Sequence, residues 1–430
     1  MAKKQSTIWL CENCGNEFSV WAGKCPMCGE WNSLKELKFE GSKPNIGSSR
    51  KAIETSTLSD IKSENTSRLE TGISELDRVL GGGVVPGSII LIGGEPGIGK
   101  STLLLQVADR IGHTFYDSAE ESINQIKLRA DRLGITNSML SLASESDIDA
   151  VLHETKKIEP KLLIIDSIQT VFTNDYDATP GSLVQVRECG MKLQQFAKSS
   201  GIPVIIIGHV TKEGNLAGPR ILEHLVDTVL YLEGERFNDA RILRGVKNRF
   251  GATNEVGIFK MAEEGMVEVK NPSELFLQER RNSPGSVVTV TLEGTRPILI
   301  EIQALVVPTH FGYPKRTSSG FDLNRLNLLA AVITKKTAFN LSNSDIYLNV
   351  IGGMKLNEPA VDLAVTAAII SSYKNKALPN KLCLFGEVGL LGEVRNVTRQ
   401  KDREKEAKNL GYEITAKISD LSELVSLLVI

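Results

Sequence analysis

The chain has 430 residues, of which 41% are hydrophobic and 24% are charged, and its net charge is −2. This length exceeds what one hydrophobic core usually organises, so we expect at least two domains. The composition excludes a mainly disordered or fibrous protein. Aliphatic runs such as Ile202 to Ile207 are far shorter than the ~20 residues of a membrane-spanning helix. No secretory signal follows Met1, so we expect a cytoplasmic protein that does not bind membranes.

Four cysteines lie close together at the N-terminus: Cys11, Cys14, Cys25 and Cys28. Each Cys-x2-Cys pair directs two thiolates at one point, and four thiolates give the closed tetrahedral coordination of structural zinc. Iron is the less favoured alternative. We expect residues 1–32 to form a zinc-binding module that presents a surface to DNA or to a protein. Residues 33–67 are rich in polar side chains beyond position 40 and are predicted to form a flexible linker.

Residues 68–272 alternate short apolar runs with helical patterns. The predicted strands are Ser88–Gly93, Thr114–Asp117, Leu162–Asp166 and Ile202–Gly208. Helical spacing follows at Thr102–Arg110 and from Ile148, where Ser146 and Asp149 could form a capping box. Strands that are apolar on both faces and separated by helices predict an α/β domain with a parallel sheet. Ligands of such sheets bind beyond the carboxyl ends of the strands.

A complete phosphate-binding motif follows the first of these strands. Its residues and the next one along the helix are Gly94, Glu95, Pro96, Gly97, Ile98, Gly99, Lys100, Ser101 and Thr102. The sequence matches G-x-x-x-x-G-K-[ST], in which backbone N–H groups surround the phosphates. We expect these residues to bind ATP, with Lys100 at the β- and γ-phosphates and Ser101 as a ligand of Mg²⁺.

Acidic residues follow two of the other predicted strands. Asp166 ends the run Leu162–Asp166 and is predicted to help to hold Mg²⁺. Glu120 and Glu121 follow the strand that ends near Asp117. Hydrolysis needs a group that orients or deprotonates water, and we assign this role to Glu120, with Glu121 as the alternative.

Basic residues are concentrated between positions 236 and 251. They are Arg236, Arg241, Arg244, Lys247 and Arg249. A solvated face is the simplest interpretation of such a cluster. The predicted loops 169–181, with Phe172 and Tyr176, and 209–220 leave the carboxyl edge of the sheet and are candidates for contact with single-stranded DNA. His209 and His224 are interpreted as structural.

Residues 273–430 continue the alternation without a second phosphate-binding motif. The predicted strands are Ser286–Leu292, Ile298–Ala304 and Ile346–Ile351, and the predicted helices are Leu323–Thr334 and Pro359–Tyr373. We expect these elements to form an α+β domain.

Taken in order, the motifs resemble those of the bacterial RadA family, also called Sms, of DNA repair and recombination proteins. The resemblance rests on the four-cysteine segment and on the segments 93–101, 120–122, 163–169, 218–224 and 247–251. It implies a RecA-like P-loop ATPase core at 68–272, assembled as a homohexamer. It further implies a DNA-dependent ATPase that drives branch migration on single-stranded and branched DNA, with a recombinase of the RecA type as partner.

The same resemblance suggests a role for the segment Lys247-Asn-Arg-Phe-Gly251. Lys247 and Arg249 would act either on the γ-phosphate held by a neighbouring subunit, as an arginine finger does, or on DNA. The sequence leaves these two roles open.

Residues 273–430 resemble the proteolytic domain of the Lon family, through Asn349–Leu363 and Gly386–Val394. Ala360 occupies the position of the nucleophilic serine of that family, and Lys401 lies near the position of its lysine. A lysine without a hydroxyl to activate does not form the catalytic dyad. We therefore expect a proteolytically inactive domain that serves oligomerisation and DNA contact.

Two other functions are considered. An ATP-dependent Lon-like protease would account for the C-terminal domain, but Ala360 argues against it. A nucleotide-switched scaffold or kinase would account for the paired glutamates, but it leaves the basic segment around Lys247 without a purpose.

Overall fold

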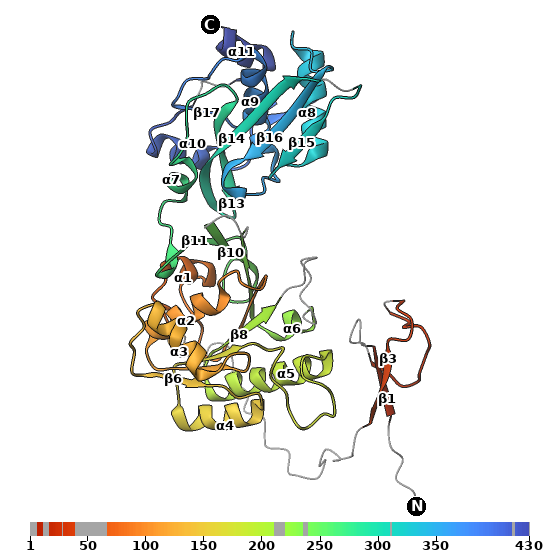
Figure 1. Ribbon diagram of the computed structural model, residues 1–430, viewed down its shortest axis with the longest axis vertical. Helices are drawn as coiled ribbons and strands as arrows, with labels where there is room; N and C mark the ends of the chain where they lie inside the picture. Colours follow the sequence, from red (N-terminus) through yellow and green to blue (C-terminus); the bar gives the residue numbers. More distant parts are fainter. Residues whose placement is uncertain are drawn as a thin grey trace, which may run out of the picture. The chain divides into compact units, whose positions relative to one another are not determined.

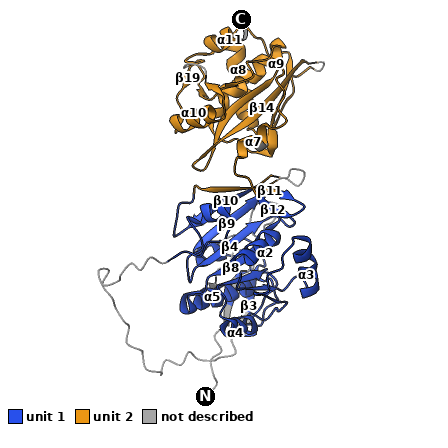
Figure 2. Ribbon diagram, turned by 90° about the vertical axis from the view of Figure 1, so that its left-hand side faces the viewer, with its two compact units in different colours: residues 1–233, 242–253, 261–267 blue, residues 234–241, 254–260, 268–430 orange. Residues whose placement is uncertain are grey.

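The computed structural model describes residues 7–11, 17–27, 29–38, 67–209, 220–234, 240–309, 312–414 and 418–429. The chain divides into two compact units (Figure 2). The first comprises residues 1–233, 242–253 and 261–267, and the second comprises residues 234–241, 254–260 and 268–430. Among the described residues, no helix is both long enough and apolar enough to cross a bilayer.

The N-terminal segment forms a small antiparallel sheet of its own. Its strands are β1 (Thr7–Cys11), β2 (Glu17–Phe18) and β3 (Leu34–Lys38), in the order β2-β1-β3. Cys11, Cys25 and Leu34 are buried at its centre. So small a core indicates that the module depends on a further source of stability, as a bound metal provides.

A nine-stranded sheet forms the centre of the first unit, in the order β12-β11-β10-β9-β4-β8-β7-β5-β6. The strands are β4 (Ile89–Gly94), β5 (Thr114–Ser118), β6 (Leu140–Ala143), β7 (Leu162–Asp166), β8 (Val204–His209), β9 (Thr228–Glu233), β10 (Ala240–Asn248), β11 (Val256–Ala262) and β12 (Gly265–Glu268). The six strands from β9 to β6 in this order are parallel to one another. The predicted parallel sheet is confirmed, and β7 has the predicted bounds.

Helices of this unit are α1 (Ser74–Leu80), α2 (Lys100–Ile111), α3 (Ile123–Arg132), α4 (Ile148–Ile158), α5 (Leu183–Ser200) and α6 (Arg220–Leu225). Apolar side chains of α4 and α5 pack on β4, β5, β7 and β8 (Figure 1). All residues of β4 and β7 are buried, as expected for strands covered on both faces.

Two local predictions are wrong. The capping box predicted at Ser146 does not form, because the side chain of Asp147 instead accepts a hydrogen bond from the N–H of Asp149 and caps α4. The basic segment predicted as one solvated face is largely strand β10, which pairs antiparallel with β9. Arg241 is buried, Arg244 at an alternate position of the strand is partly exposed, and Arg249, beyond the end of the strand, is exposed, so the cations do not share one face. Arg236 lies outside the described residues.

The second unit contains a six-stranded mixed sheet in the order β15-β16-β14-β13-β17-β20 and a two-stranded sheet of β18 and β19. The strands are β13 (Ser286–Glu293), β14 (Arg296–Pro308), β15 (Arg316–Ser319), β16 (Ser344–Val350), β17 (Leu382–Cys383), β18 (Glu387–Val388), β19 (Val394–Arg395) and β20 (Glu413–Ile414). The helices are α7 (Pro272–Leu277), α8 (Leu323–Lys336), α9 (Asp362–Lys374), α10 (Gln400–Asn409) and α11 (Leu421–Val429), with 3₁₀ turns at Ile351–Gly353 and Pro359–Val361. Helix α9 is buried along its first ten residues and packs on β13 and β14.

Candidate nucleotide-binding site

The phosphate-binding motif forms the turn between β4 and α2, as predicted. Gly94, Gly97 and Gly99 all have positive φ angles. At Gly94 a Cβ atom would lie 2.6 Å from the carbonyl oxygen of Leu232, and at Gly99 it would lie 2.6 Å from the Cε of Met261. Only glycine fits these positions, and the resulting turn leads directly into the N-terminus of α2, where phosphate groups are favoured.

Lys100 is 4% exposed and lies inside this turn. Its Nζ donates hydrogen bonds to the carbonyl oxygens of Gly94 (2.8 Å) and Glu95 (3.0 Å). Burial lowers the pKa of the Lys100 ammonium group to about 8, although the charges of Asp166 and Glu120 act in the opposite direction. The buried ammonium group is therefore directed at the loop that would surround the phosphates.

Asp166 ends β7 and is 3% exposed. The hydroxyl of Tyr116 on β5 donates a 2.6 Å hydrogen bond to Asp166 Oδ2. This bond fixes the orientation of the carboxylate, and burial beside Asp166 raises the pKa of Tyr116 well above its usual range. Ser101 lies in the first turn of α2 and remains partly exposed. A hydroxyl and a carboxylate are the oxygen ligands that Mg²⁺ takes beside a nucleotide.

Glu120 follows β5, and one oxygen of its carboxylate has two hydrogen-bond partners. The hydroxyl of Ser167 donates to Glu120 Oε1 at 2.5 Å, and His209 Nε2 lies 2.9 Å from the same oxygen. The hydrogen bond from His209 is the main cause of a lowered pKa of Glu120, opposed by burial and assisted by Ser167. The carboxylate is therefore ionised at neutral pH, as a group that orients or accepts a proton from water must be.

Glu121, the alternative, is held differently. Its Oε1 forms an ion pair with Arg129 on α3, and its backbone N–H donates to the hydroxyl of Ser118. This ion pair draws the side chain towards α3, whereas Glu120 interacts electrostatically with Lys100. The geometry favours Glu120 over Glu121.

Sequence reasoning missed the partners Tyr116, Ser167 and His209. His209 was expected to be structural, but it ends β8 and contacts Glu120. Its Nδ1, and both polar side-chain atoms of Gln169, are buried without a hydrogen-bond partner in the described structure. Unsatisfied buried polar atoms are rare and are concentrated at functional sites. The position of Ser167 and His209 at the carboxyl ends of parallel strands is the signal that could have identified them. Tyr116, inside β5, carries no such signal.

Residues 247–251 comprise the end of β10 and the bend that follows it, and this segment is anchored at several points. Lys247 Nζ donates to the carbonyl oxygens of Glu223 (2.5 Å) and Val226 (2.8 Å), at the C-terminal end of α6. Arg249 forms an ion pair with Asp227 at 3.2 Å and is half exposed. Burial and the charge of Arg249 lower the pKa of Lys247. Within one chain, neither cation contacts Glu120 or Lys100.

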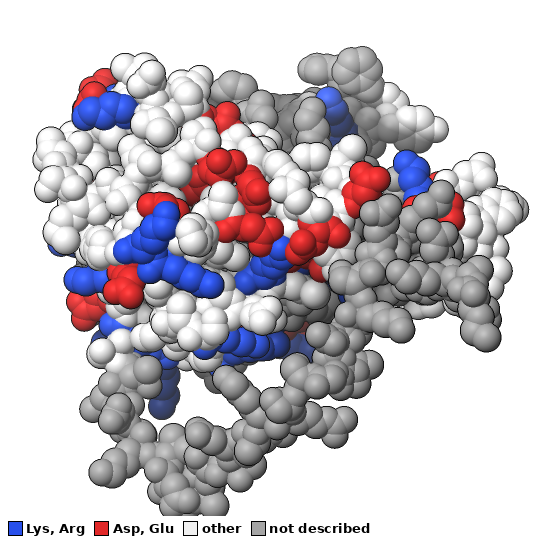
Figure 3. All heavy atoms as spheres, turned by 90° about the horizontal axis from the view of Figure 1, so that it is seen from below, with Lys and Arg blue, Asp and Glu red and all other residues white. Residues whose placement is uncertain are grey.

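The loop 169–181 contains no lysine or arginine and carries Asp175 and Asp177. The buried amide of Gln185 holds it, because Nε2 donates to the carbonyl oxygens of Thr173, Tyr176 and Ala178 and Oε1 accepts from the N–H of Thr173. The face seen in Figure 3 shows acidic side chains near its middle, with separate groups of basic ones around them. The expected aromatic residues Phe172 and Tyr176 are partly buried. Most of the other candidate loop, residues 210–219, lies outside the described residues.

Two of the four predicted zinc ligands are described. Cys11 and Cys25 are 0% and 1% exposed and belong to the same small core. The N–H of Gly29, at a φ of +77°, donates to the carbonyl oxygen of Cys25 at 2.9 Å. Cys14 and Cys28 lie outside the described residues. Buried thiol groups in so small a core fit a structural zinc ion.

In the second unit, Ala360 is buried and its carbonyl oxygen accepts a hydrogen bond from the N–H of Gly386 at 2.7 Å. Lys401 is exposed. The guanidinium group of Arg403 is buried and forms an ion pair with the carboxylate of Glu358. The same carboxylate accepts a hydrogen bond from the N–H of Leu292. The region thus contains a structural ion pair and no hydroxyl at position 360.

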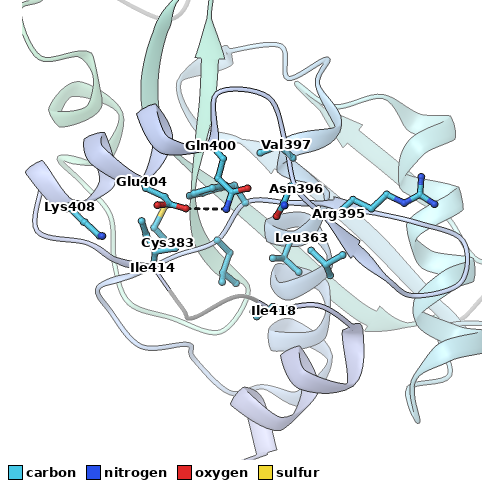
Figure 4. A pocket seen from close by; sticks show the side chains of 13 residues that line it. Leu363, Cys383, Arg395, Asn396, Val397, Gln400, Glu404, Lys408, Ile414 and Ile418 are labelled. Atoms are coloured by element: carbon cyan, nitrogen blue, oxygen red, sulfur yellow. Dashed lines mark hydrogen bonds between the residues drawn. The ribbon is translucent and has the colours of Figure 1, made fainter.

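A cavity of about 390 Å³ lies elsewhere in this unit (Figure 4). Gln400, Glu404 and Lys408 on α10 line one wall, and Gln400 donates to Glu404 at 3.0 Å. Arg395 and Asn396 also line it, and apolar residues that include Cys383 and Leu363 form the remainder. Neither Ala360 nor Lys401 lines it.

Two protein families match parts of the chain. Residues 55–215 match the AAA domain, and residues 9–36 match the rubredoxin metal binding domain. The second match supports the prediction that the N-terminal module is a zinc ribbon.

Characterised proteins match over almost the whole length. The DNA repair protein RadA of Bacillus subtilis (strain 168) is 51% identical over 422 residues, which are 96% of this chain and 92% of that protein. The DNA repair protein RadA of Listeria monocytogenes serovar 1/2a is 51% identical over 421 residues, with the same coverage. Solved structures that match include the RadB recombinase (24% identity, TM-score 0.39, 47% of this chain and 100% of that chain) and a KaiC-like protein from the hyperthermophilic archaeon Pyrococcus horikoshii (20%, 0.39, 47% and 99%).

Proposed function

The chain belongs to the DNA repair protein RadA family, and from this premise we propose that it is a DNA-dependent ATPase of homologous recombination. It acts in the cytoplasm as a ring-shaped motor on single-stranded DNA and drives branch migration of recombination intermediates. The observation that carries this proposal is the convergence of Lys100, Asp166 and Glu120 at the carboxyl edge of one parallel sheet. This is the set of groups that cleavage of a bound nucleoside triphosphate requires.

In this proposal residues 94–102 bind the phosphates of ATP through backbone N–H groups and through Lys100. Ser101 and Asp166 are the residues that would hold Mg²⁺, which when bound neutralises charge on the phosphates. Tyr116 keeps the Asp166 carboxylate oriented by its 2.6 Å hydrogen bond. The chemistry of this donor set, one hydroxyl and one carboxylate, suits the ion.

Glu120 orients the attacking water and accepts its proton. Ser167 and His209 hold one oxygen of the carboxylate, so the second oxygen can be directed at water. Because the lowered pKa keeps Glu120 ionised, the residue is ready to act at neutral pH.

Assembly as a homohexamer would bring Lys247 and Arg249 to a second nucleotide. The support is that both cations lie in one anchored segment at the end of β10 and, among the described residues, contact neither Lys100 nor Glu120 of their own chain. A cation supplied by a neighbour stabilises charge that develops on the transferred phosphoryl group. Contact of these cations with DNA is the alternative role.

The proposed domains are a zinc module, an ATPase core at 68–272 and an inactive Lon-like domain at 273–430. The boundary expected between a module at 1–32 and a linker at 33–67 lies too early, because β3 (Leu34–Lys38) pairs with β1 and belongs to the module. The linker is therefore proposed to begin after β3. The buried Ala360 supports the absence of proteolysis. The ring would act on branched DNA produced by a recombinase of the RecA type.

Steady-state hydrolysis of ATP tests the proposal, measured with and without single-stranded DNA. We expect DNA to stimulate turnover by the wild-type chain and Lys100→Ala to abolish it, because the buried ammonium group is lost. Equal rates in the presence and absence of DNA would contradict the proposed DNA dependence.

A further inference from the structure

The described part of the N-terminal module exposes several large apolar side chains. Trp21 is 53% exposed and Trp31 is 67% exposed, and Val20 and Met27 are exposed to a similar extent. Trp9, in contrast, packs against the small core around Cys11. Burying a large apolar side chain is worth about 1.5–3 kcal/mol. A module with so few core residues forgoes this gain at several positions, which indicates a surface that binds something.

The two exposed indole rings lie next to one glycine. A Cβ atom on Gly23 would lie 3.6 Å from Cη2 of Trp21 and 4.0 Å from Cζ3 of Trp31. The backbone holds this arrangement, because the N–H of Asn32 donates to the carbonyl oxygen of Gly23 at 2.8 Å. We call the surface formed by Trp21, Gly23 and Trp31 the tryptophan shelf.

The rings of the shelf are held in place before any ligand arrives. Trp21 packs against Trp9 in an edge-to-face contact, with ring centroids 6.4 Å apart. Lys24 pairs with Trp31 in an isolated β-bridge, and its ammonium group lies 5.6 Å from the centroid of the Trp31 ring. A flat ring with an adjacent cation offers a stacking surface and a contact for a phosphate.

These features favour nucleobases over an apolar protein segment as the ligand. A protein segment would use the aliphatic side chains of Val20 and Met27 as much as the rings, but it would gain nothing from Lys24. Single-stranded DNA can use both the rings and the cation, because each base has an aromatic face and each nucleotide carries a negative phosphate. Base stacking on an aromatic side chain is tolerant of sequence, as a motor that moves along DNA requires.

We infer that the tryptophan shelf binds single-stranded DNA, with bases stacked on Trp21 and Trp31 and a phosphate at Lys24. This inference rests on the proposed action on DNA and adds a contact outside the ATPase core. The contact would persist whether or not ATP is bound, because the shelf contains no part of the nucleotide site.

Tryptophan fluorescence tests the inference, because Trp9, Trp21 and Trp31 are the three tryptophans of the whole chain. The full zinc-loaded chain is excited at wavelengths that tyrosine does not absorb and is titrated with oligothymidylate. Binding is followed in parallel by the anisotropy of a dye on the oligonucleotide. We expect the tryptophan emission to be quenched as the anisotropy rises.

Variants assign the signal to the shelf. In a chain with Trp21→Phe and Trp31→Phe the remaining emission of Trp9 should be insensitive to DNA, while Trp9→Phe leaves the quenching intact. In Trp21→Ala with Trp31→Ala we expect a loss of at least about tenfold in oligonucleotide affinity at matched zinc content. The control Val20→Ser with Met27→Gln, which removes exposed apolar groups but no ring, should bind as the wild type does.

Saturated anisotropy with unchanged tryptophan emission would overturn the inference while leaving DNA binding by the ATPase core intact. That outcome would assign the shelf to a protein partner. Absence of any oligonucleotide binding would overturn both the inference and the proposed function. Stacking would also be contradicted if Val20→Ser with Met27→Gln lost as much oligonucleotide affinity as Trp21→Ala with Trp31→Ala.

Discussion

Glu120 has two hydrogen-bond partners on one oxygen, and these partners come from two different strands. Ser167 follows β7 and His209 ends β8. The sequence predicted Glu120 from its position after a strand, as it predicted Lys100 and Asp166 from their motifs. It could not predict His209 as a partner, because the order of β8, β7 and β5 in the sheet brings the two residues together.

Replacing Glu120 should separate binding from hydrolysis. Glu120→Gln keeps the size of the side chain but removes the charge that accepts a proton, so we expect turnover to fall by roughly 10²–10⁴-fold with ATP still bound. Glu121→Gln is the matched control and should retain most activity, because Glu121 is committed to Arg129. Phosphate release and nucleotide binding measure the two effects. The reverse order of the two variants would transfer the role to Glu121.

The contact with His209 should be visible in the pH dependence. The hydrogen bond from His209 lowers the pKa of Glu120, so the carboxylate stays ionised to a lower pH than usual. His209→Ala removes that bond and raises the pKa, and the acidic limb of the kcat profile should move to higher pH. Ser167→Ala should move it less and in the same direction, while His209→Gln should restore it in part. An acidic limb that does not move in His209→Ala would show that the contact has no effect on Glu120.

At the scale of elements, apolar runs predicted the central strands because a buried parallel strand has little choice of composition. The ends of elements were less predictable. Several acceptors compete at the start of α4, and there Asp147 rather than Ser146 provides the cap. Strand β10 was not predicted, because its charged residues resemble a cluster on the surface. In the structure the strand pairs with β9, and its charged side chains differ in burial.

Gln185 is expected to control the loop 169–181. Its side chain satisfies three carbonyl groups and one N–H group of that loop or its flanks. Gln185→Ala leaves these groups without partners at a cost of about 1–3 kcal/mol. Limited proteolysis should cleave the variant faster within this loop, and thermal unfolding should shift to lower temperature. Gln194→Ala on the same helix is the control, since its side chain does not reach the loop. Equal cleavage of both variants would contradict the role of Gln185.

At the scale of the whole chain, composition and motifs were enough to separate the parts, because each has its own source of stability. The ATPase core is stabilised by buried apolar strands. The N-terminal module has only a small core, together with four cysteines that can bind a metal. The resemblance to Lon proteases led to the expectation about Ala360, but the buried pair of Arg403 and Glu358 depends on side-chain packing that no motif records.

Removal of zinc should therefore affect the N-terminal module alone. A chelator is expected to unfold the N-terminal module, because the metal supplies most of its stability. All three tryptophans lie in this module, so their emission should shift to longer wavelength as Trp9 becomes exposed. Binding of ATP should be unchanged, and Cys25→Ser should reproduce the effect without a chelator. Emission that stays unchanged in a zinc-free chain would show that the module folds without metal.

The most direct test of the proposed motor is movement of a branch point. Purified protein is mixed with a joint molecule whose invading strand is labelled, and the length of the paired region is followed in time. The proposal predicts extension with ATP, none with a non-hydrolysable analogue, and none with Lys247→Ala that still binds ATP. Extension at the same rate without ATP hydrolysis, or hydrolysis that never moves the branch point, would contradict it.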